Sequence, residues 1–320
     1  MRLAPSLRCL VAALTLAAGA AQAFPHKPVR LVVPQTPGGA SDSLARIVGQ
    51  RLSEKWGQPV VIENRAGAGG NIGMDAVAKS AADGHTLLMS YVGSHAINSS
   101  IYKKLPFDPE NDFTAVATIA NVPFVAVANP AVPAASMKEL AAYASANPNA
   151  SFGSAGNGSV NHLLGEMFNS AASLKMKHIP YKGAAPALTD LIAGQIQLVF
   201  TSLPSVAGHI KAGTLRGLAV TSAKRSSAFR DLPTMAEAGY PQLGINAWFA
   251  IFAPAGTPVA VVRQINADIN ATLQEKDIAE KIAAQGAEVS ISSPQELSAQ
   301  LSADIRKWAV VVKQSGASVE

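Results

Sequence analysis

The sequence predicts an α/β fold with mainly parallel sheets and helices on both faces. Short apolar, β-branched runs alternate with stretches of helical apolar spacing, beginning with 29–33 and then 42–56. Such alternation favours parallel strands joined by helices that cover both sides of a sheet. At 320 residues, the chain is long enough for two ordinary domains even after removal of a short leader.

The individual elements follow from hydrophobic periodicity and from the turn residues that bound each run. The predicted strands are Val29–Val33, Val60–Ile62, Thr86–Met89, Phe124–Ala128, Leu198–Thr201, Leu215–Val220 and Trp248–Phe252. The predicted helices are Asp42–Trp56, Asn71–Ser80, Met137–Ala146, Asn161–Ala172, Ala184–Ala193, Val259–Gln274 and Gln295–Lys313.

The N-terminus has the pattern of a secretory signal peptide. Arg2 and Arg8 precede the apolar stretch 9–20, and Ala21-Gln22-Ala23 provides a small-x-small cleavage site. The apolar stretch is shorter than the roughly 20 residues that span a bilayer. We therefore expect cleavage after Ala23 and export to the periplasm, and because the single cysteine is Cys9, the mature chain is expected to have no disulfide.

Charge gives a weaker indication of the partner. The formal net charge is +5, and the basic residues are scattered rather than clustered. A basic cluster is the usual mark of a nucleic-acid partner, so none is predicted. The mild positive balance favours an anionic ligand.

Three glycine-rich loops, namely loop one (37–42), loop two (67–73) and loop three (153–159), each lead into a predicted helix, and the first two follow a predicted strand. Ligands of open α/β sheets bind beyond the carboxyl ends of the strands. Glycine lets a ligand approach the backbone, and the amides of a helix N-terminus attract a carboxylate or phosphate. Ser41, Asn71 and Ser159 are predicted N-caps. The alternative is that these loops are only tight strand-to-helix turns.

Spacing excludes several chemistries. A dinucleotide fingerprint would require glycine at Ile72 or Asn161, and the chain has no P-loop and no His-Glu-x-x-His metal motif. No cofactor or metal is predicted. A secreted serine hydrolase using Ser159 and His162 remains the alternative, although Ser159 lacks the flanking glycines of a nucleophile elbow. Asp42 and Asp190 are interpreted as a helix-dipole partner and a solvated helix residue.

Taken in order, these loops resemble the Bug/TctC-type receptors of tripartite tricarboxylate transporters. The resemblance covers nearly the whole mature chain. The matching segments are 37–46, 61–73, 83–88, 153–163, 180–194, 232–239 and 253–258.

The resemblance implies a two-lobed type II periplasmic-binding fold. Residues 24–123 plus 247–320 would form lobe one, and 124–246 lobe two. The implied function is that of a monomeric, non-enzymatic solute-binding receptor that delivers a small organic carboxylate to membrane permease subunits. A dicarboxylate, a tricarboxylate, an amino acid and an aromatic acid remain open as the ligand. A ligand sensor that feeds a signalling receptor remains an alternative.

The resemblance also implies that backbone amides and hydroxyls hold the carboxylate between the lobes. The site residues expected from lobe one are Gly38, Gly39, Ser41, Asp42, Ser90, Tyr91 and Ser94. Those expected from lobe two are Ser154, Asn157, Gly158, Ser159, His162, Tyr181 and Thr201, with Ser202 beside it. Gln35 stands where the family often carries an aromatic residue, which favours a more polar ligand.

Overall fold

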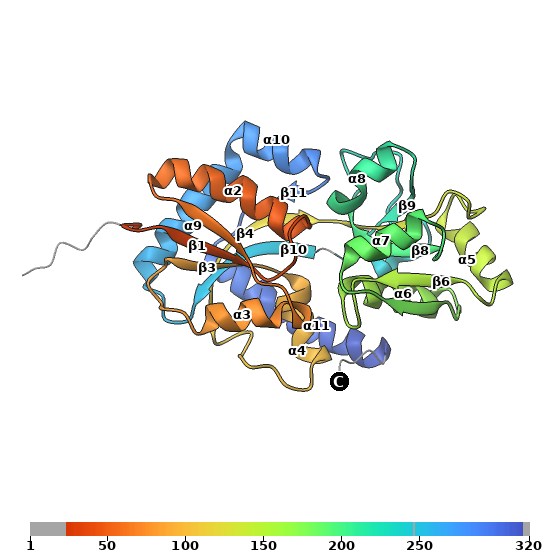
Figure 1. Cartoon of the computed structure of the whole chain (residues 1–320), viewed down its shortest axis with the longest axis horizontal. Coiled ribbons are helices and arrows are strands. Elements are labelled where there is room, and N and C mark those ends of the chain that lie inside the picture. The colour runs from red at the N-terminus through yellow and green to blue at the C-terminus, as the bar shows by residue number, and fades with distance from the viewer. Residues whose placement is uncertain (1–23, 246, 316–320) are drawn as a thin grey trace, which may run out of the picture.

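Two sheets, each covered by helices, organise the chain (Figure 1). The computed structural model describes residues 24–245 and 247–315. The predicted signal peptide, residues 1–23, lies outside the described residues. Within them, no helix is both long enough and apolar enough to cross a membrane.

The first sheet has six strands in the order β11-β4-β10-β3-β1-β2. Its strands are β1 (Val29–Val33), β2 (Val60–Asn64), β3 (Thr86–Tyr91), β4 (Phe113–Val122), β10 (Ala247–Pro254) and β11 (Glu288–Val289). Its helical segments are α2 (Ala40–Trp56), η1 (Ala68–Gly70), α3 (Asn71–Ala78), η2 (Gly93–Ile97), α4 (Asn98–Ile101), α9 (Val259–Gln274), α10 (Lys276–Ala284) and α11 (Pro294–Ser315).

The second sheet has five strands in the order β7-β6-β8-β5-β9. Its strands are β5 (Phe124–Ala128), β6 (Ser151–Ser154), β7 (Lys177–Pro180), β8 (Leu198–Ser202) and β9 (Arg216–Val220). Its helical segments are α5 (Met137–Ala146), α6 (Val160–Ala171), α7 (Ala184–Ile192), α8 (Leu203–Lys211) and η3 (Pro241–Leu243).

Alternation along the central strands explains why helices cover both faces. In β1, Leu31 belongs to a buried cluster with α2 and α9, whereas Val32 belongs to a cluster with α3 and α11. In β5, Val125 joins the cluster of α7 and α8, whereas Ala126 joins that of α5 and α6. Successive side chains of a strand point to opposite faces, so strands buried on both sides need helices on both sides.

The expectation of mainly parallel sheets needs correction, because both sheets are mixed. Four strand pairings are parallel and five are antiparallel. The chain leaves the first sheet at Val122, enters the second at Phe124, and returns at Ala247. β5 runs antiparallel to both of its neighbours, and β10 to both β3 and β4. The strands next to the crossings therefore account for much of the antiparallel pairing.

Helix α11 connects the two halves. It packs against β4 and α4 of the first half and against α6 of the second. Trp308 of α11 is 2 % exposed and belongs to the same buried cluster as Leu163 and Leu164 of α6. At the start of β10, the buried Trp248 donates from Nε1 to Oδ2 of Asp304 in α11, at 2.7 Å. Burial raises the pKa of Asp304, and the hydrogen bond from Trp248 opposes that rise.

We predict that Trp248→Phe destabilises the protein by about 1–3 kcal/mol, because it leaves the half-buried carboxylate of Asp304 without the hydrogen bond from Trp248. Urea unfolding followed by circular dichroism measures the change. Asp304→Asn is the matched control, because its side-chain oxygen still accepts the Trp248 hydrogen bond, and it should cost less. Equal unfolding midpoints for Trp248→Phe and wild type would contradict this role.

Candidate functional site

A cavity of about 700 Å³ lies between the half of the fold that contains the first sheet and the half that contains the second. The first half contributes Pro34, Gln35, Thr36, Gly39, Ala40, Ser41, residues 66–70, Tyr91, Gly93, Asn98, Tyr102 and Phe249. The second half contributes Phe124, residues 155–159, Asn161, residues 182–184, Thr201, Ser202 and Ser205.

Five helix starts reach this cavity. The lining includes the N-cap residues of α2, α3, α6, α7 and α8, which are Gly39, Gly70, Ser159, Gly183 and Ser202. The first amides of a helix have no acceptor within the helix, and the helix dipole makes that end positive. In the part of the chain that the structure describes, no Asp or Glu lines the cavity. The cavity is therefore built to receive negative charge.

Loop one is held in shape by Asp42. The Gly38 amide and Arg46 Nε each donate to Asp42 Oδ2 at 3.0 Å. Burial raises the pKa of Asp42, but the hydrogen bonds from Arg46 and Gly38 outweigh burial, so the pKa lies below its ordinary value. The predicted N-cap Ser41 is wrong: α2 begins at Ala40, and its N-cap Gly39 provides no side-chain cap. The Ala40 and Ser41 amides therefore lack a capping acceptor at the cavity wall.

Loop two approaches the cavity through backbone that favours glycine. Gly70 is the N-cap of α3 with a φ of 102°, so the predicted cap Asn71 lies inside the helix. Asn71 instead accepts a 2.7 Å hydrogen bond from Asn98, which also donates to the Gly69 carbonyl at 3.1 Å. Asn98 and Tyr102 both line the cavity.

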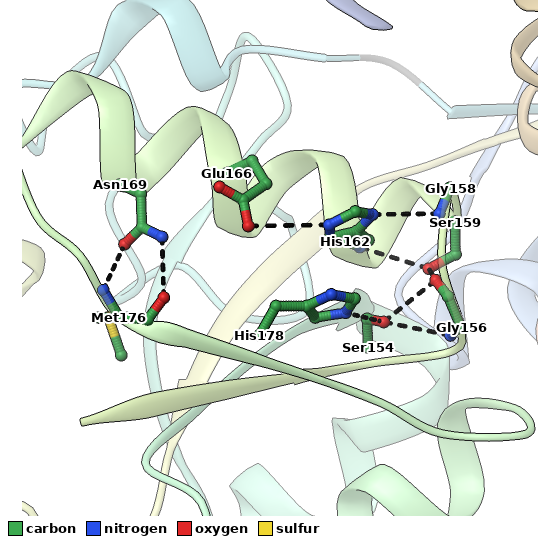
Figure 2. Close-up of polar contacts among 9 residues, drawn as sticks. All are labelled: Ser154, Gly156, Gly158, Ser159, His162, Glu166, Asn169, Met176 and His178. Atoms are coloured by element: carbon green, nitrogen blue, oxygen red, sulfur yellow. Dashed lines mark hydrogen bonds and ion pairs between the residues drawn. The ribbon is translucent and has the colours of Figure 1, made fainter. Parts of the chain in front are cut away.

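Loop three is a compact hydrogen-bonded turn (Figure 2). Ser159 is the N-cap of α6, as predicted: its Oγ accepts from the His162 amide at 3.3 Å and donates to the Gly156 carbonyl at 2.7 Å. The Gly158 amide donates to His162 Nδ1 at 3.0 Å, and the Gly156 amide to Ser154 Oγ at 3.1 Å. These two amides already have partners within the protein.

Two histidines lie beside loop three (Figure 2). The rings of His162 and His178 stack with centroids 3.8 Å apart. His178 Nε2 lies 2.6 Å from Ser154 Oγ, and His162 Nε2 lies 3.7 Å from Glu166 Oε1. Burial, with a contribution from His162, lowers the pKa of His178 to about 4. His178 is therefore neutral in this arrangement at neutral pH.

The structure divides the expected site residues into two sets. Those that line the cavity are Gly39, Ser41, Tyr91, Asn157, Gly158, Ser159 and Thr201, with Ser202. Those absent from the lining are Gly38, Asp42, Ser90, Ser94, Ser154, His162 and Tyr181.

The second set contributes mainly to the framework behind the wall. Ser94 Oγ accepts from Gln35 Nε2 at 3.0 Å, and Tyr181 donates to Asp190 Oδ2 at 2.6 Å. Ser90 lies fully buried within β3. Asp190 was interpreted as a solvated residue, but it is half-buried and engaged by Tyr181.

Sequence reasoning missed several lining residues. Asn98 and Tyr102 lie in and just after a short helical segment without a motif, and Ser205 lies in the first turn of α8. Lys182 belongs to the matching segment 180–194 but is not among the expected site residues, yet it is the one described lining residue with a charged side chain. The strand that precedes it, β7, was not predicted from the sequence, so no predicted strand end pointed to Lys182.

The geometry does not favour nucleophilic catalysis at Ser159. Its hydroxyl contacts the His162 backbone amide rather than the imidazole, whose Nδ1 accepts from Gly158. A nucleophile requires a base within hydrogen-bond reach. Ser154 has such a contact with His178, but Ser154 is fully buried and does not line the cavity. Among the described residues, no cluster of His, Cys, Asp or Glu is suited to hold a metal ion.

Comparisons with known proteins agree with this geometry. Residues 44–317 match the model of the tripartite tricarboxylate transporter family receptor. Protein BugT of Bordetella pertussis is 40 % identical over 302 residues, which cover 94 % of this chain and 93 % of BugT.

Solved structures are similar over almost the whole chain. A periplasmic transporter superposes with a TM-score of 0.89 at 38 % identity, covering 93 % of this chain and 100 % of the other. An R. palustris protein with adipate superposes with a TM-score of 0.88 at 40 % identity, covering 92 % of this chain and 99 % of the other. MatC from Rhodopseudomonas palustris with bound malate superposes with a TM-score of 0.84 at 31 % identity, covering 90 % of this chain and 100 % of the other. These likenesses confirm the two-lobed fold.

The histidine stack generates a pH prediction. The ordinary pKa of histidine is 6.5 and that of His178 in the folded protein is about 4. Between these values the unfolded chain binds more protons, so the free energy of unfolding falls as pH falls from 6.5 towards 4. His178→Gln should reduce this slope by about one proton. Part of the slope should remain, because the pKa of His95 is also about 4 and burial lowers the pKa of His85 as well.

Urea unfolding at several pH values between 4.5 and 7 measures the slope. Ser154→Ala is the control, because it removes the hydrogen bond but leaves His178 buried, and it should retain the wild-type slope at lower stability. The same slope in His178→Gln and wild type would contradict the prediction.

Proposed function

The chain belongs to the tripartite tricarboxylate transporter receptor family and is a solute-binding receptor, and from this premise we propose that its solute is a small organic carboxylate held between the two lobes. The convergence of five helix starts on a cavity without acidic lining residues carries the proposal. Charge-assisted hydrogen bonds from such amides contribute roughly 1.5–3 kcal/mol each.

The α2 start is the primary anion subsite in this proposal. Gly39 leaves the first turn of α2 without a side-chain cap, and Ala40 and Ser41 line the cavity. Loop three contributes chiefly its shape and the exposed part of Asn157, since the Gly156 and Gly158 amides are engaged by Ser154 and His162.

The remaining walls suit a short carbon chain. Tyr91, Tyr102, Phe124 and Phe249 provide aromatic surface, and Gln35 adds an amide. Two structural relatives were solved with adipate and malate, which are both dicarboxylates. Small dicarboxylates are therefore the ligand class that we propose for this chain.

Lobe one comprises residues 24–123 and 247–320 in this proposal, and lobe two residues 124–246. The two passages of the chain between the sheets, at Pro123 and just before Ala247, support these boundaries. Binding would close the lobes about these connections by a hinge motion. The protein would act in the periplasm after removal of residues 1–23, as a monomer that delivers its ligand to membrane permease subunits.

We further propose that the ligand leaves unchanged. The described cavity lining contains no His, Asp or Glu that could serve as a general base. A receptor needs only reversible capture, which hydrogen bonds from fixed amides supply.

We predict that Gly39→Val weakens carboxylate binding at least about tenfold, or roughly 1.4 kcal/mol. Gly39 has an ordinary φ of −85°, and a Cβ there would meet only the Thr36 carbonyl at 3.9 Å, so the fold should tolerate valine. The larger side chain would obstruct approach to the α2 amides. Calorimetric titration with adipate and malate measures the affinity.

Gly208→Val is the matched control, because Gly208 is equally unobstructed but lies on α8 away from the cavity lining. Gly158→Val is a poor test, because a Cβ there would lie 2.5 Å from Ile101 and the φ is +76°. Wild-type affinity in a folded Gly39→Val variant would exclude the α2 start as the anion subsite.

Processing provides a separate prediction. The exported protein should begin at Phe24, and replacing Ala21 and Ala23 by Leu should leave the leader attached, because the cleavage site requires small residues there. Intact-mass measurement of the periplasmic fraction distinguishes the two forms. A mature wild-type chain that retains Met1 would refute the proposed export.

A further inference from the structure

We propose that Lys182 is a specificity-determining residue that binds a second anionic group of the ligand, so that the receptor prefers dianions to monoanions. This inference rests on the proposed function, since it assumes that a first carboxylate occupies the cavity. Lys182 is the one described lining residue with a charged side chain.

The backbone on either side of Lys182 is fixed. The Tyr181 amide donates to the Ser154 carbonyl at 3.1 Å, and its hydroxyl donates to Asp190 at 2.6 Å. Gly183, the N-cap of α7, follows with a φ of 123°, which favours glycine. Lys182 therefore projects from a defined position in the cavity wall.

The charge of Lys182 has no acidic partner among the described residues. Some other lysines do have such a partner, for example Lys55 with Asp268 and Lys79 with Asp75. The nearest acid in sequence, Asp190, is already engaged by Tyr181. An ammonium group at a cavity wall that lacks acids is available to a ligand anion.

The position of Lys182 determines which ligands it recognises. Lys182 and α7 belong to the second half of the chain, whereas the α2 start belongs to the first. A ligand with one carboxylate at α2 and another at Lys182 would contact both lobes. A flexible four-carbon side chain accepts a range of spacings, so Lys182 selects for a second charge rather than for one chain length.

The experiment compares matched acids by calorimetric titration. Adipate is paired with hexanoate, and succinate with butyrate. Wild type should bind each dicarboxylate at least fivefold more tightly than its partner, and added salt should weaken this preference, because ions screen the exposed ammonium. Lys182→Met should reduce the preference to within twofold, leaving hexanoate and butyrate affinities unchanged. Lys182→Arg should retain it.

Lys138→Met is the matched control. Lys138 is an exposed lysine on α5, at the end of lobe two remote from lobe one (Figure 1), and it does not line the cavity. This variant loses the same charge, so it should bind all four acids as wild type does. If Lys138→Met also loses the preference, overall charge rather than Lys182 creates it.

The outcomes separate this inference from the proposed function. An unchanged preference in Lys182→Met would overturn the role of Lys182 and leave carboxylate binding intact. If Lys182→Met loses affinity equally for the dicarboxylate and the monocarboxylate of each pair, the inference is also overturned, because Lys182 would then bind the carboxylate that both acids share. Failure of wild type to bind any of the four acids would count against the proposed function itself.

Discussion

Backbone amides at the positive ends of several helices impose the constraint on which the site depends. Such amides need an acceptor, and the N-caps Gly39, Gly70 and Gly183 provide no side chain to supply one. At α3 the Asn71 amide already donates to the Ala68 carbonyl. Because no Asp or Glu lines the cavity among the described residues, solvent or a ligand must complete the starts of α2 and α7. The α/β architecture brings them together, since strand-to-helix loops meet at the edges of the two sheets.

The protein divides its polar groups between holding the loops and holding the ligand. Asp42 fixes loop one by accepting from the Gly38 amide. In loop three, Ser154 and His162 accept from the Gly156 and Gly158 amides. These side chains have conspicuous chemistry, and for that reason the sequence drew attention to them. Fixing the loops before the ligand arrives lowers the entropic cost of binding. Their contribution to affinity is therefore indirect, through the shape of the cavity.

The sequence predicted most of the helices and about two thirds of the strands, but it missed β4, β6, β7, α8 and α10, and it predicted the detailed site less well. α5 begins and ends as predicted, because Ser136 caps it and its apolar spacing is regular. Ser41 and Asn71 failed as caps because the preceding glycines let the chain turn earlier. His162 has the same sequence context whether it faces the ligand or the loop, so only three-dimensional geometry could decide. Lys182 and Asn98 reach the cavity through tertiary packing that no local pattern records.

The packing of α11 has a mechanical consequence. It packs against β4 and α4 of the first half of the fold and against α6 of the second, and Trp308 shares a buried cluster with Leu163. If the lobes separate, α11 must either bend along with α6 or expose apolar side chains to water, at about 25 cal/mol for each Å² uncovered. Opening of the lobes would therefore cost free energy at α11, and closing would recover it, so the packing of this helix favours the closed arrangement.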